Sequence, residues 1–146
     1  IDFDLDLAVS QSKDNAVYYI QYAHARVNRM VDVKAPEKGI PFDRSKAADY
    51  DATLLTLDAE TEILAKLAAY PEIVLRAANS YEPHQVGNYL KELAALFHGW
   101  YNLDNTRIID EQNIALSQAR LLLSINVQQV LRNGLELLGV SAPETM

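Results

Sequence analysis

The sequence has no cysteine among its 146 residues, so neither a disulfide framework nor a thiolate zinc site can form. It also lacks an apolar run of the roughly 18 residues needed to span a bilayer. Its first residues, IDFDLDLAVS, are acidic, whereas a signal peptide begins with basic residues. These absences exclude a disulfide-rich secreted scaffold and favour a cytoplasmic protein without a membrane partner.

Side chains arranged for catalysis are also scarce. The three histidines, His24, His84 and His98, do not follow a metal-ligand spacing, and no Ser, His and Asp set is suggested by position. No glycine-rich phosphate loop is present. We therefore expect no catalytic residue, no metal site and no cofactor in this chain.

Acidic residues outnumber basic ones, and they are unevenly distributed. The net charge of −7 and the pI of about 4.8 argue against indiscriminate binding to a phosphate backbone, so DNA is not an expected partner. Residues 13–46 nevertheless hold seven bases against four acids, whereas residues 49–72 hold one base against six acids. The basic surplus therefore falls on one segment near the start of the chain.

Helical periodicity dominates the sequence and predicts an all-α bundle of about five helices. Proline and glycine in KAPEKGIPFDRSKA predict a loop, Gly99 predicts a bend or early end in its helix, and Asn133-Gly134 predicts a bend or break. Asp14 or Asn15 is suited to cap the first helix, and Gly139 to end the last. The expected helices are residues 15–34, about 56–70, 71–79, 83–102 and 111–132, with a last turn at LELLG.

The first residues differ from the rest because IDFDLDLA alternates apolar and charged side chains, as a half-buried strand does. A single strand has no partner for its backbone. We therefore expect residues 1–13 to form an extended arm, either paired with part of a longer protein or lying across the bundle, and residues 14–146 to form the helical domain.

The segment YYIQYAHARVNRM has an unusual content of tyrosine and arginine for a helix in an acidic protein. At about 100° per residue, Tyr19, Tyr22, Arg26 and Arg29 fall within about 80° of one another, beside an apolar stripe. Aromatic rings offer faces on which bases stack, and Arg binds phosphates or base edges. The band therefore predicts a site for single-stranded or looped RNA.

Two other interpretations of this band remain open. Tyr and Arg also cover the edge of a core with their amphipathic bodies, and they are enriched at protein–protein interfaces. The chain could then be a helical bundle that binds a partner helix or its own copy. His24 borders the apolar stripe, and we interpret it as a hydrogen-bonded packing residue.

Four segments together resemble a known family. NAVYYIQYAHARV resembles the opening of the C-terminal anticodon-binding (DALR-type) domain of arginyl-tRNA synthetases, which are class I aminoacyl-tRNA synthetases. FDLDLAVSQSKDN resembles the junction with their catalytic domain, YEPHQVGNYLKELAALFHGWYN their long middle helix, and ARLLLSINVQQVLRNGLELLGVSAPETM their C-terminal end. The segments follow one another in the family's order and cover most of the chain.

The resemblance implies a helical bundle that docks on the anticodon stem-loop of tRNA(Arg). Arginylation with ATP and Mg²⁺ would be carried out by a catalytic domain of the same polypeptide, whose HIGH-type signature is absent here. The resemblance further implies that Tyr19, Tyr22 and Arg26 approach the anticodon bases, and that Tyr101 and Met146 reach the anticodon loop. Because Tyr101 also lies on an apolar stripe, a packing role remains open for it. Arg107 and Arg120 are additional RNA-facing candidates.

Overall fold

The structure is a computed structural model that describes residues 15–103 and 107–146. All regular secondary structure in these ranges is helical, which confirms the all-α prediction. The expected arm, residues 1–13, lies outside the described residues. The α-helices of the described part are α2 (Ala16–Arg29), α3 (Ala35–Glu37), α4 (Asp58–Ala68), α5 (Tyr70–Ser80), α6 (His84–Tyr101) and α7 (Ile114–Leu137).

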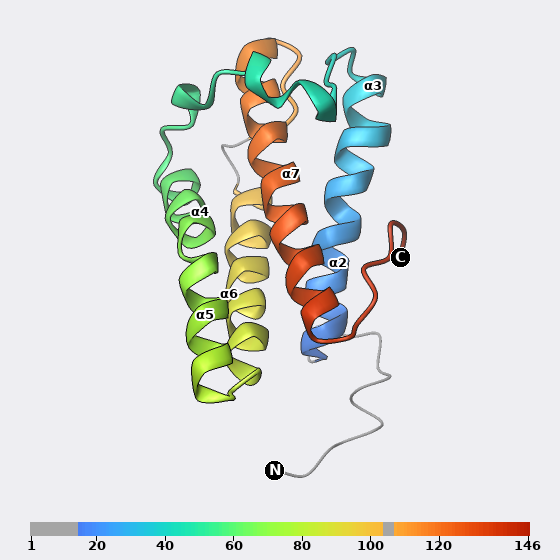
Figure 1. Cartoon of the computed structure of the whole chain (residues 1–146). Helices are drawn as coiled ribbons and strands as arrows, with labels where there is room; N and C mark the ends of the chain where they lie inside the picture. The colour runs from blue at the N-terminus through green and yellow to red at the C-terminus, as the bar shows by residue number, and fades with distance from the viewer. Residues whose placement is uncertain (1–14, 104–106) are drawn as a thin grey trace.

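Helices α6 and α7 lie together in the middle of the bundle (Figure 1). Helix α2 packs against both of them on one side, and α4 packs against both on the other. Helix α5 follows α4 and packs on α6. None of the helices in the described ranges is long and apolar enough to cross a bilayer.

Helix α2 begins where the sequence predicts, because the Asn15 side chain caps it. Asn15 Oδ1 accepts hydrogen bonds from the backbone N–H groups of Val17 and Tyr18, at 3.1 and 3.3 Å. The helix does not remain uniformly α-helical: residues Met30–Lys34 form a π-helix that leads into α3. A π-helical turn contains an extra residue, so it changes the direction in which the following side chains point.

The segment predicted as a loop is more ordered than expected. Residues 34–47 contain α3 and, after Gly39 with its φ of 70°, the start of a 3₁₀ helix, Arg44–Asp49; a second 3₁₀ helix, Ala52–Leu54, follows beyond the predicted loop. The aspartates that precede them cap their first turns, with Asp43 Oδ1 accepting from Ser45 N at 2.9 Å and Asp51 Oδ1 accepting from Thr53 N at 3.0 Å. Short Asx turns of this kind form locally, which is why a prediction based on helical periodicity missed them.

The last helix starts later than predicted and has no interruption at the expected place, although Gly139 ends it as predicted. Helix α7 starts at Ile114 with Asn113 as its N-cap, not at residue 111, and it continues through Asn133-Gly134 to Leu137 without a break. Gly134 is required by packing, since a Cβ there would lie 2.5 Å from Leu90 Cδ2 on α6. The predicted early end at Gly99 is also wrong, because α6 reaches Tyr101.

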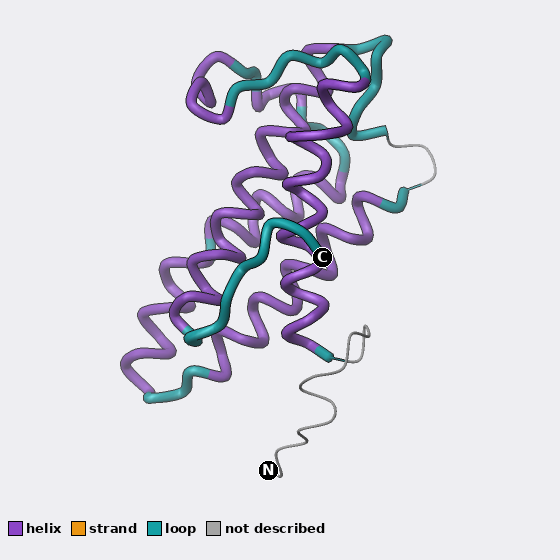
Figure 2. The backbone as a smooth tube through the Cα atoms, turned by 90° about the vertical axis from the view of Figure 1, so that its right-hand side faces the viewer, coloured by secondary structure: helices purple, strands orange, loops and turns teal. Residues whose placement is uncertain are grey.

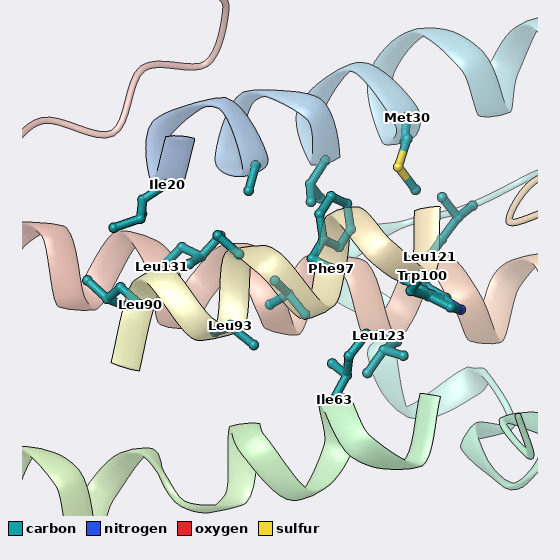
Figure 3. Packing of buried hydrophobic residues seen from close by; sticks show 14 of the residues in the cluster. Ile20, Met30, Ile63, Leu90, Leu93, Phe97, Trp100, Leu121, Leu123 and Leu131 are labelled. Carbon is teal, nitrogen blue, oxygen red and sulfur yellow. The ribbon is translucent and has the colours of Figure 1, made fainter. Parts of the chain in front are cut away.

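The core is formed by apolar side chains from α2, α4, α6 and α7 (Figure 3). Phe97 of α6 and Met30 of the π-helix after α2 both point into this core, and Ile63 reaches it from α4. These side chains and Trp100 are almost completely buried. Burial of this kind stabilises by about 1.5–3 kcal/mol for each large side chain, which makes it the main stabilising contribution in the bundle.

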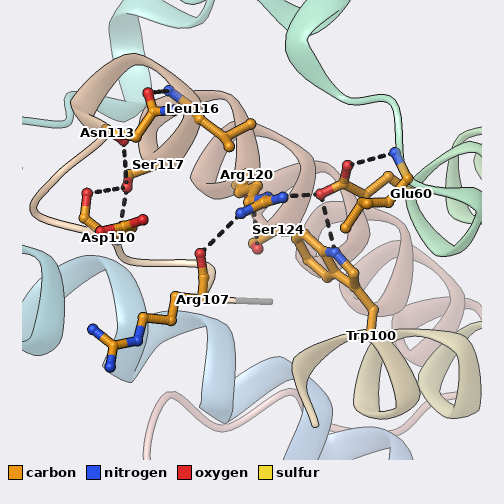
Figure 4. Close-up of polar contacts among 10 residues, drawn as sticks. Glu60, Trp100, Arg107, Asp110, Asn113, Leu116, Ser117, Arg120 and Ser124 are labelled. Carbon is orange, nitrogen blue, oxygen red and sulfur yellow. Dashed lines mark hydrogen bonds and ion pairs between the residues drawn. The ribbon is translucent and has the colours of Figure 1, made fainter. Parts of the chain in front are cut away.

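A buried ion pair connects three helices within this apolar core (Figure 4). Arg120 Nε on α7 donates to Glu60 Oε2 on α4 at 2.8 Å, and Trp100 Nε1 on α6 donates to the same oxygen at 3.2 Å. The other carboxylate oxygen accepts from Leu57 N at 3.1 Å, and Arg120 Nη1 donates to the Arg107 carbonyl at 3.0 Å. Arg120, an RNA-facing candidate from the sequence, is therefore a buried structural residue, and that prediction is wrong.

We expect Glu60→Ala to lower the free energy of unfolding by about 3–5 kcal/mol, because it leaves the Arg120 guanidinium buried without its carboxylate. Glu62→Ala is the matched control: Glu62 is an exposed residue of the same helix, and its replacement should change stability by less than about 0.5 kcal/mol. Urea unfolding of both variants makes the comparison. Equal transition midpoints would show that the ion pair contributes nothing specific.

Replacement of Gly134 by alanine should destabilise the bundle. Alanine favours a helix by about 1 kcal/mol relative to glycine, but the clash with buried Leu90 costs about 1–3 kcal/mol. Gly99→Ala should instead stabilise, because Gly99 is exposed and a Cβ there meets nothing within 4 Å. Thermal unfolding should therefore shift in opposite directions for the two variants, and a gain in stability for Gly134→Ala would contradict this packing argument.

Candidate nucleic-acid interface

Arg26 lies at the centre of the predicted band, where α2 meets the end of α6. Its Cζ lies 4.0 Å from the centroid of the Tyr101 ring and 5.0 Å from that of Tyr22. Its Nη1 donates to His98 Nδ1 at 3.0 Å, and its Nη2 donates to the Tyr22 hydroxyl at 3.4 Å. Cation–π contacts and hydrogen bonds therefore hold the guanidinium group among three aromatic rings from two helices.

Tyr101 also contacts the π-helical segment. Lys34 Nζ donates to the Tyr101 hydroxyl at 2.6 Å and lies 5.3 Å from the ring centroid. The Tyr101 ring also packs on Phe97, with centroids 6.3 Å apart. Tyr101 is thus half-buried: its body belongs to the core edge, as its apolar position in the sequence suggested, and its polar end faces the surface.

A groove of about 450 Å³ opens beside these residues. One wall is α2 with the π-helix, and the opposite wall is the segment at the end of the chain. Among the residues lining it are three cations, two aromatic rings and two carboxylates, together with the Met146 side chain. They are Tyr22, Arg26, Arg29, Asp32, Lys34, Tyr101, Glu144 and Met146.

The structure brings five of the six predicted residues around this one groove, namely Tyr22, Arg26, Arg29, Tyr101 and Met146. The sixth, Tyr19, is half-buried and lines a neighbouring hollow of about 370 Å³ that shares Tyr22 and Arg26. Tyr22 is 38% exposed and Met146 50% exposed, so both can be reached by a ligand. Their contact with RNA stays a prediction.

The final segment of the chain runs along α2, in the direction opposite to α7 (Figure 2). Gln21 Nε2 donates to the Ser141 carbonyl at 2.9 Å, and His24 Nδ1 bonds the Pro143 carbonyl at 3.0 Å. His24 is completely buried, which confirms its interpretation as a hydrogen-bonded packing residue. Burial is the main reason why the pKa of His24 is lowered; the Pro143 carbonyl opposes this shift and the Arg132 guanidinium adds to it.

His98 is a residue of this site that the sequence interpretation missed. It is buried, and its ring contacts Tyr19 and Tyr22, with centroid distances of 4.8 and 5.6 Å. Burial and the nearby Arg26 guanidinium lower the pKa of His98 to about 4, although the Tyr19 backbone weakly opposes the shift. Since Nδ1 accepts from Arg26, the neutral ring carries its proton on Nε2, which is buried and has no partner with good hydrogen-bond geometry among the described residues.

Two further residues were missed for different reasons. On a uniform α-helix, Lys34 would fall on the core stripe of α2, and the π-helix moves it toward Tyr101. Tyr18 stacks on Tyr22 with ring centroids 6.3 Å apart, and its spacing of four residues from Tyr22 could have revealed it.

Arg107 is exposed and lines a separate hollow with Lys34 and Lys38.

The described residues contain no group of three or more His, Asp or Glu side chains that could hold a metal ion. The groove supplies aromatic rings, cations and hydrogen-bonding groups.

Comparison with known families identifies the domain. The model of the DALR anticodon binding domain matches residues 20–146, which include the groove and all of α6 and α7. This chain belongs to the DALR anticodon-binding domain family. The family prediction made from the four sequence segments is thereby confirmed.

Relatives of this DALR domain are arginine–tRNA ligases. It is 75% identical over its full length to the arginine–tRNA ligase of Acinetobacter baumannii strain AYE, and 54% identical to that of Psychrobacter sp. strain PRwf-1. The solved arginyl-tRNA synthetase of Thermus thermophilus superposes with a TM-score of 0.81 and 30% identity over the whole chain. The chain spans 24% of the length of the Acinetobacter and Thermus proteins and 25% of the Psychrobacter protein.

The lowered pKa of the buried His98 predicts how the stability of this DALR domain depends on pH. In the unfolded chain a histidine takes up a proton below a pKa of about 6.5, but folded His98 stays neutral until the pH nears 4. The stability contributed by the neutral ring is therefore complete above pH 6.5 and is lost as the pH falls toward 4. We expect the free energy of unfolding to decrease over this range more steeply in the natural domain than in His98→Gln.

The His98 ring resonances in an NMR titration provide the direct measurement. Their midpoint should lie near pH 4. A midpoint at the ordinary value of 6.5 would show that Arg26 and burial do not keep the ring neutral.

Proposed function

We propose that the domain binds the anticodon stem-loop of tRNA(Arg) through the groove between α2 and the final segment of the chain. The observation that carries this proposal is the convergence of Tyr22, Tyr101 and three cations on one opening of nucleotide size. Unpaired bases of an RNA loop expose flat faces and hydrogen-bonding edges, and the groove offers partners for both.

Each kind of residue has a distinct role in this proposal. The exposed Tyr22 ring offers a face for base stacking. Arg26 contacts the rings of Tyr22 and Tyr101 and so sets the distance between them. Arg29 is exposed and can neutralise a phosphate. The carboxylates of Asp32 and Glu144 can accept hydrogen bonds from the amino groups of bases.

Charge supports recognition of a specific loop over general binding to nucleic acids. The whole chain carries a net charge of −7, so attraction to RNA has to come from a local surface. Arg26, Arg29 and Lys34 provide that surface at the groove, next to two carboxylates that oppose a closely approaching phosphate backbone. This balance favours RNA whose bases, and not only its phosphates, enter the groove.

We further propose that the domain serves as the tRNA-recognition part of an arginine–tRNA ligase in the cytoplasm. The relatives' names support this proposal, and the domain spans only about a quarter of their length. The described residues do not fit a site for ATP and Mg²⁺, because they contain no metal-ligand cluster and the sequence has no phosphate-binding glycine loop. Activation of arginine would then belong to a catalytic domain, with this domain positioning the tRNA.

Tyr22→Ala tests the stacking role. Loss of one stacked base should cost about 1–3 kcal/mol, so the affinity for a tRNA(Arg) anticodon stem-loop should fall by about fivefold or more. Tyr81→Ala is the matched control, because Tyr81 is 91% exposed at the end of α5 and does not line the groove. Fluorescence anisotropy with a labelled stem-loop gives both affinities. Equal losses in the two variants would contradict a role of the groove.

The salt dependence of binding separates RNA recognition from the alternative of a protein-interaction bundle. Two or three phosphates neutralised by Arg29, Lys34 and Arg26 predict a log–log slope of about −1.5 to −2.5 for stem-loop affinity against salt concentration. An apolar protein interface would show little dependence on salt. A flat response for the stem-loop, or the absence of stem-loop binding at low salt, would argue against the proposed function.

A further inference from the structure

The final segment of the chain is directed toward the groove by the way α7 ends. Gly139 adopts a φ of 73°, its N–H bonds the Glu136 carbonyl at 3.0 Å, and Val140 N–H bonds the Leu135 carbonyl at 2.8 Å. This is the Schellman pattern, which terminates a helix and reverses the chain. Val140–Met146, called here the tail, therefore returns along α2 (Figures 1 and 2).

His24 is the buried residue of α2 that holds the tail. Its Nε2 lies 3.2 Å from Arg132 Nε, and because a guanidinium group can only donate, Nε2 must accept. The ring proton is therefore on Nδ1, which donates to the Pro143 carbonyl at 3.0 Å. One residue of α7 thus selects the tautomer of His24, and this tautomer bonds the tail three residues before Met146.

A second hydrogen bond between α2 and the tail contributes less because it is exposed to solvent. Gln21 Nε2 bonds the Ser141 carbonyl at the exposed surface, where water competes for both groups. His24 is completely buried while the tail is in place, so water does not compete directly for its ring in the bond to Pro143. Val140 and Ala142 pack against the core at the start of the tail, and the bond to His24 fixes the chain directly before Glu144–Met146, which line the groove.

We propose that His24 is a positioning residue that seats the tail so that Met146 forms a wall of the RNA-binding groove. The inference rests on the proposed function, because it assigns a role within the same groove. His24 itself does not line the groove, so it acts on RNA only through the tail.

The two methionines of the sequence allow the seating of the tail to be measured directly. Met30 is almost fully buried in the core and Met146 lies in the groove, so ¹³C-methyl-methionine labelling yields one reporter for the fold and one for the tail. In His24→Leu the Met146 signal should move to the position of a free peptide and sharpen, while the Met30 signal stays in place. An unchanged Met146 signal would overturn the proposal.

His24→Asn is the conservative variant for the same measurement. The Asn amide nitrogen stands at the same bond separation from the backbone as His24 Nδ1, so it can donate to Pro143 in place of the ring. The Met146 signal should therefore stay near its natural position in this variant. If Asn and Leu release the tail equally, while Met30 is unaffected in both, the hydrogen bond to Pro143 is not what seats the tail.

Measurement of RNA affinity tests whether the seating of the tail affects binding. His24→Leu should weaken binding of the tRNA(Arg) stem-loop by about two- to tenfold, the range expected for loss of one hydrogen bond. In a chain lacking residues 144–146, the same substitution should cause no further loss. A further loss in the shortened chain would overturn the proposal, because His24 would then act on RNA independently of the tail.

Failure of the proposed function can be distinguished from failure of this inference. If the natural domain does not bind the stem-loop, the proposed function fails, and the methyl measurement alone decides whether His24 seats the tail. If the natural domain binds but His24→Leu binds equally well with a released Met146 signal, the tail is not part of the binding surface and the inference fails alone.

Discussion

The relative placement of α4, α6 and α7 depends on a single carboxylate, that of Glu60, which is buried where these helices meet. It neutralises Arg120 and accepts the indole N–H of Trp100, so it determines how the end of α6 is placed relative to α7. Tyr101 follows Trp100 directly. A buried charge without its partner is strongly unfavourable, so this geometry has few alternatives. The geometry of the groove therefore depends on an ion pair that lies outside the groove.

At the groove itself, the protein keeps one cation among aromatic rings. Arg26 lies over Tyr101 and Tyr22 and donates to His98, whose lowered pKa keeps the ring neutral and able to accept. A protonated His98 would place a second positive charge beside Arg26. Burial thereby converts a residue that often titrates near neutral pH into a stable hydrogen-bond acceptor. The same principle applies to His24, where burial and Arg132 favour the neutral tautomer that bonds the tail.

Much of the fold could be predicted because its signals are local. Asn15 caps α2, and Gly139 ends the last helix, since both depend on a few neighbouring residues. The errors arose where distant contacts override local preference. Gly134 resembles a helix breaker in the sequence, yet it lies inside α7. The Leu90 side chain of α6 packs where a Cβ at this position would lie. Arg120 resembles an exposed RNA-binding residue, yet Glu60, sixty positions away, holds it in the core.

By itself the sequence determined the all-α class, the family and the band of Tyr19, Tyr22 and Arg26, because helical periodicity and motif order depend only on the order of residues along the chain. Only the tertiary structure decided that Tyr101 and Met146 join this band, since they come from other segments that packing brings against α2. It also decided the place of Lys34, which a π-helical turn redirects, and the state of His98, whose pKa depends on burial and on Arg26. Side chains distant in sequence become neighbours only when their helices pack against one another. The periodicity of a single helix does not show which other segments will pack on it.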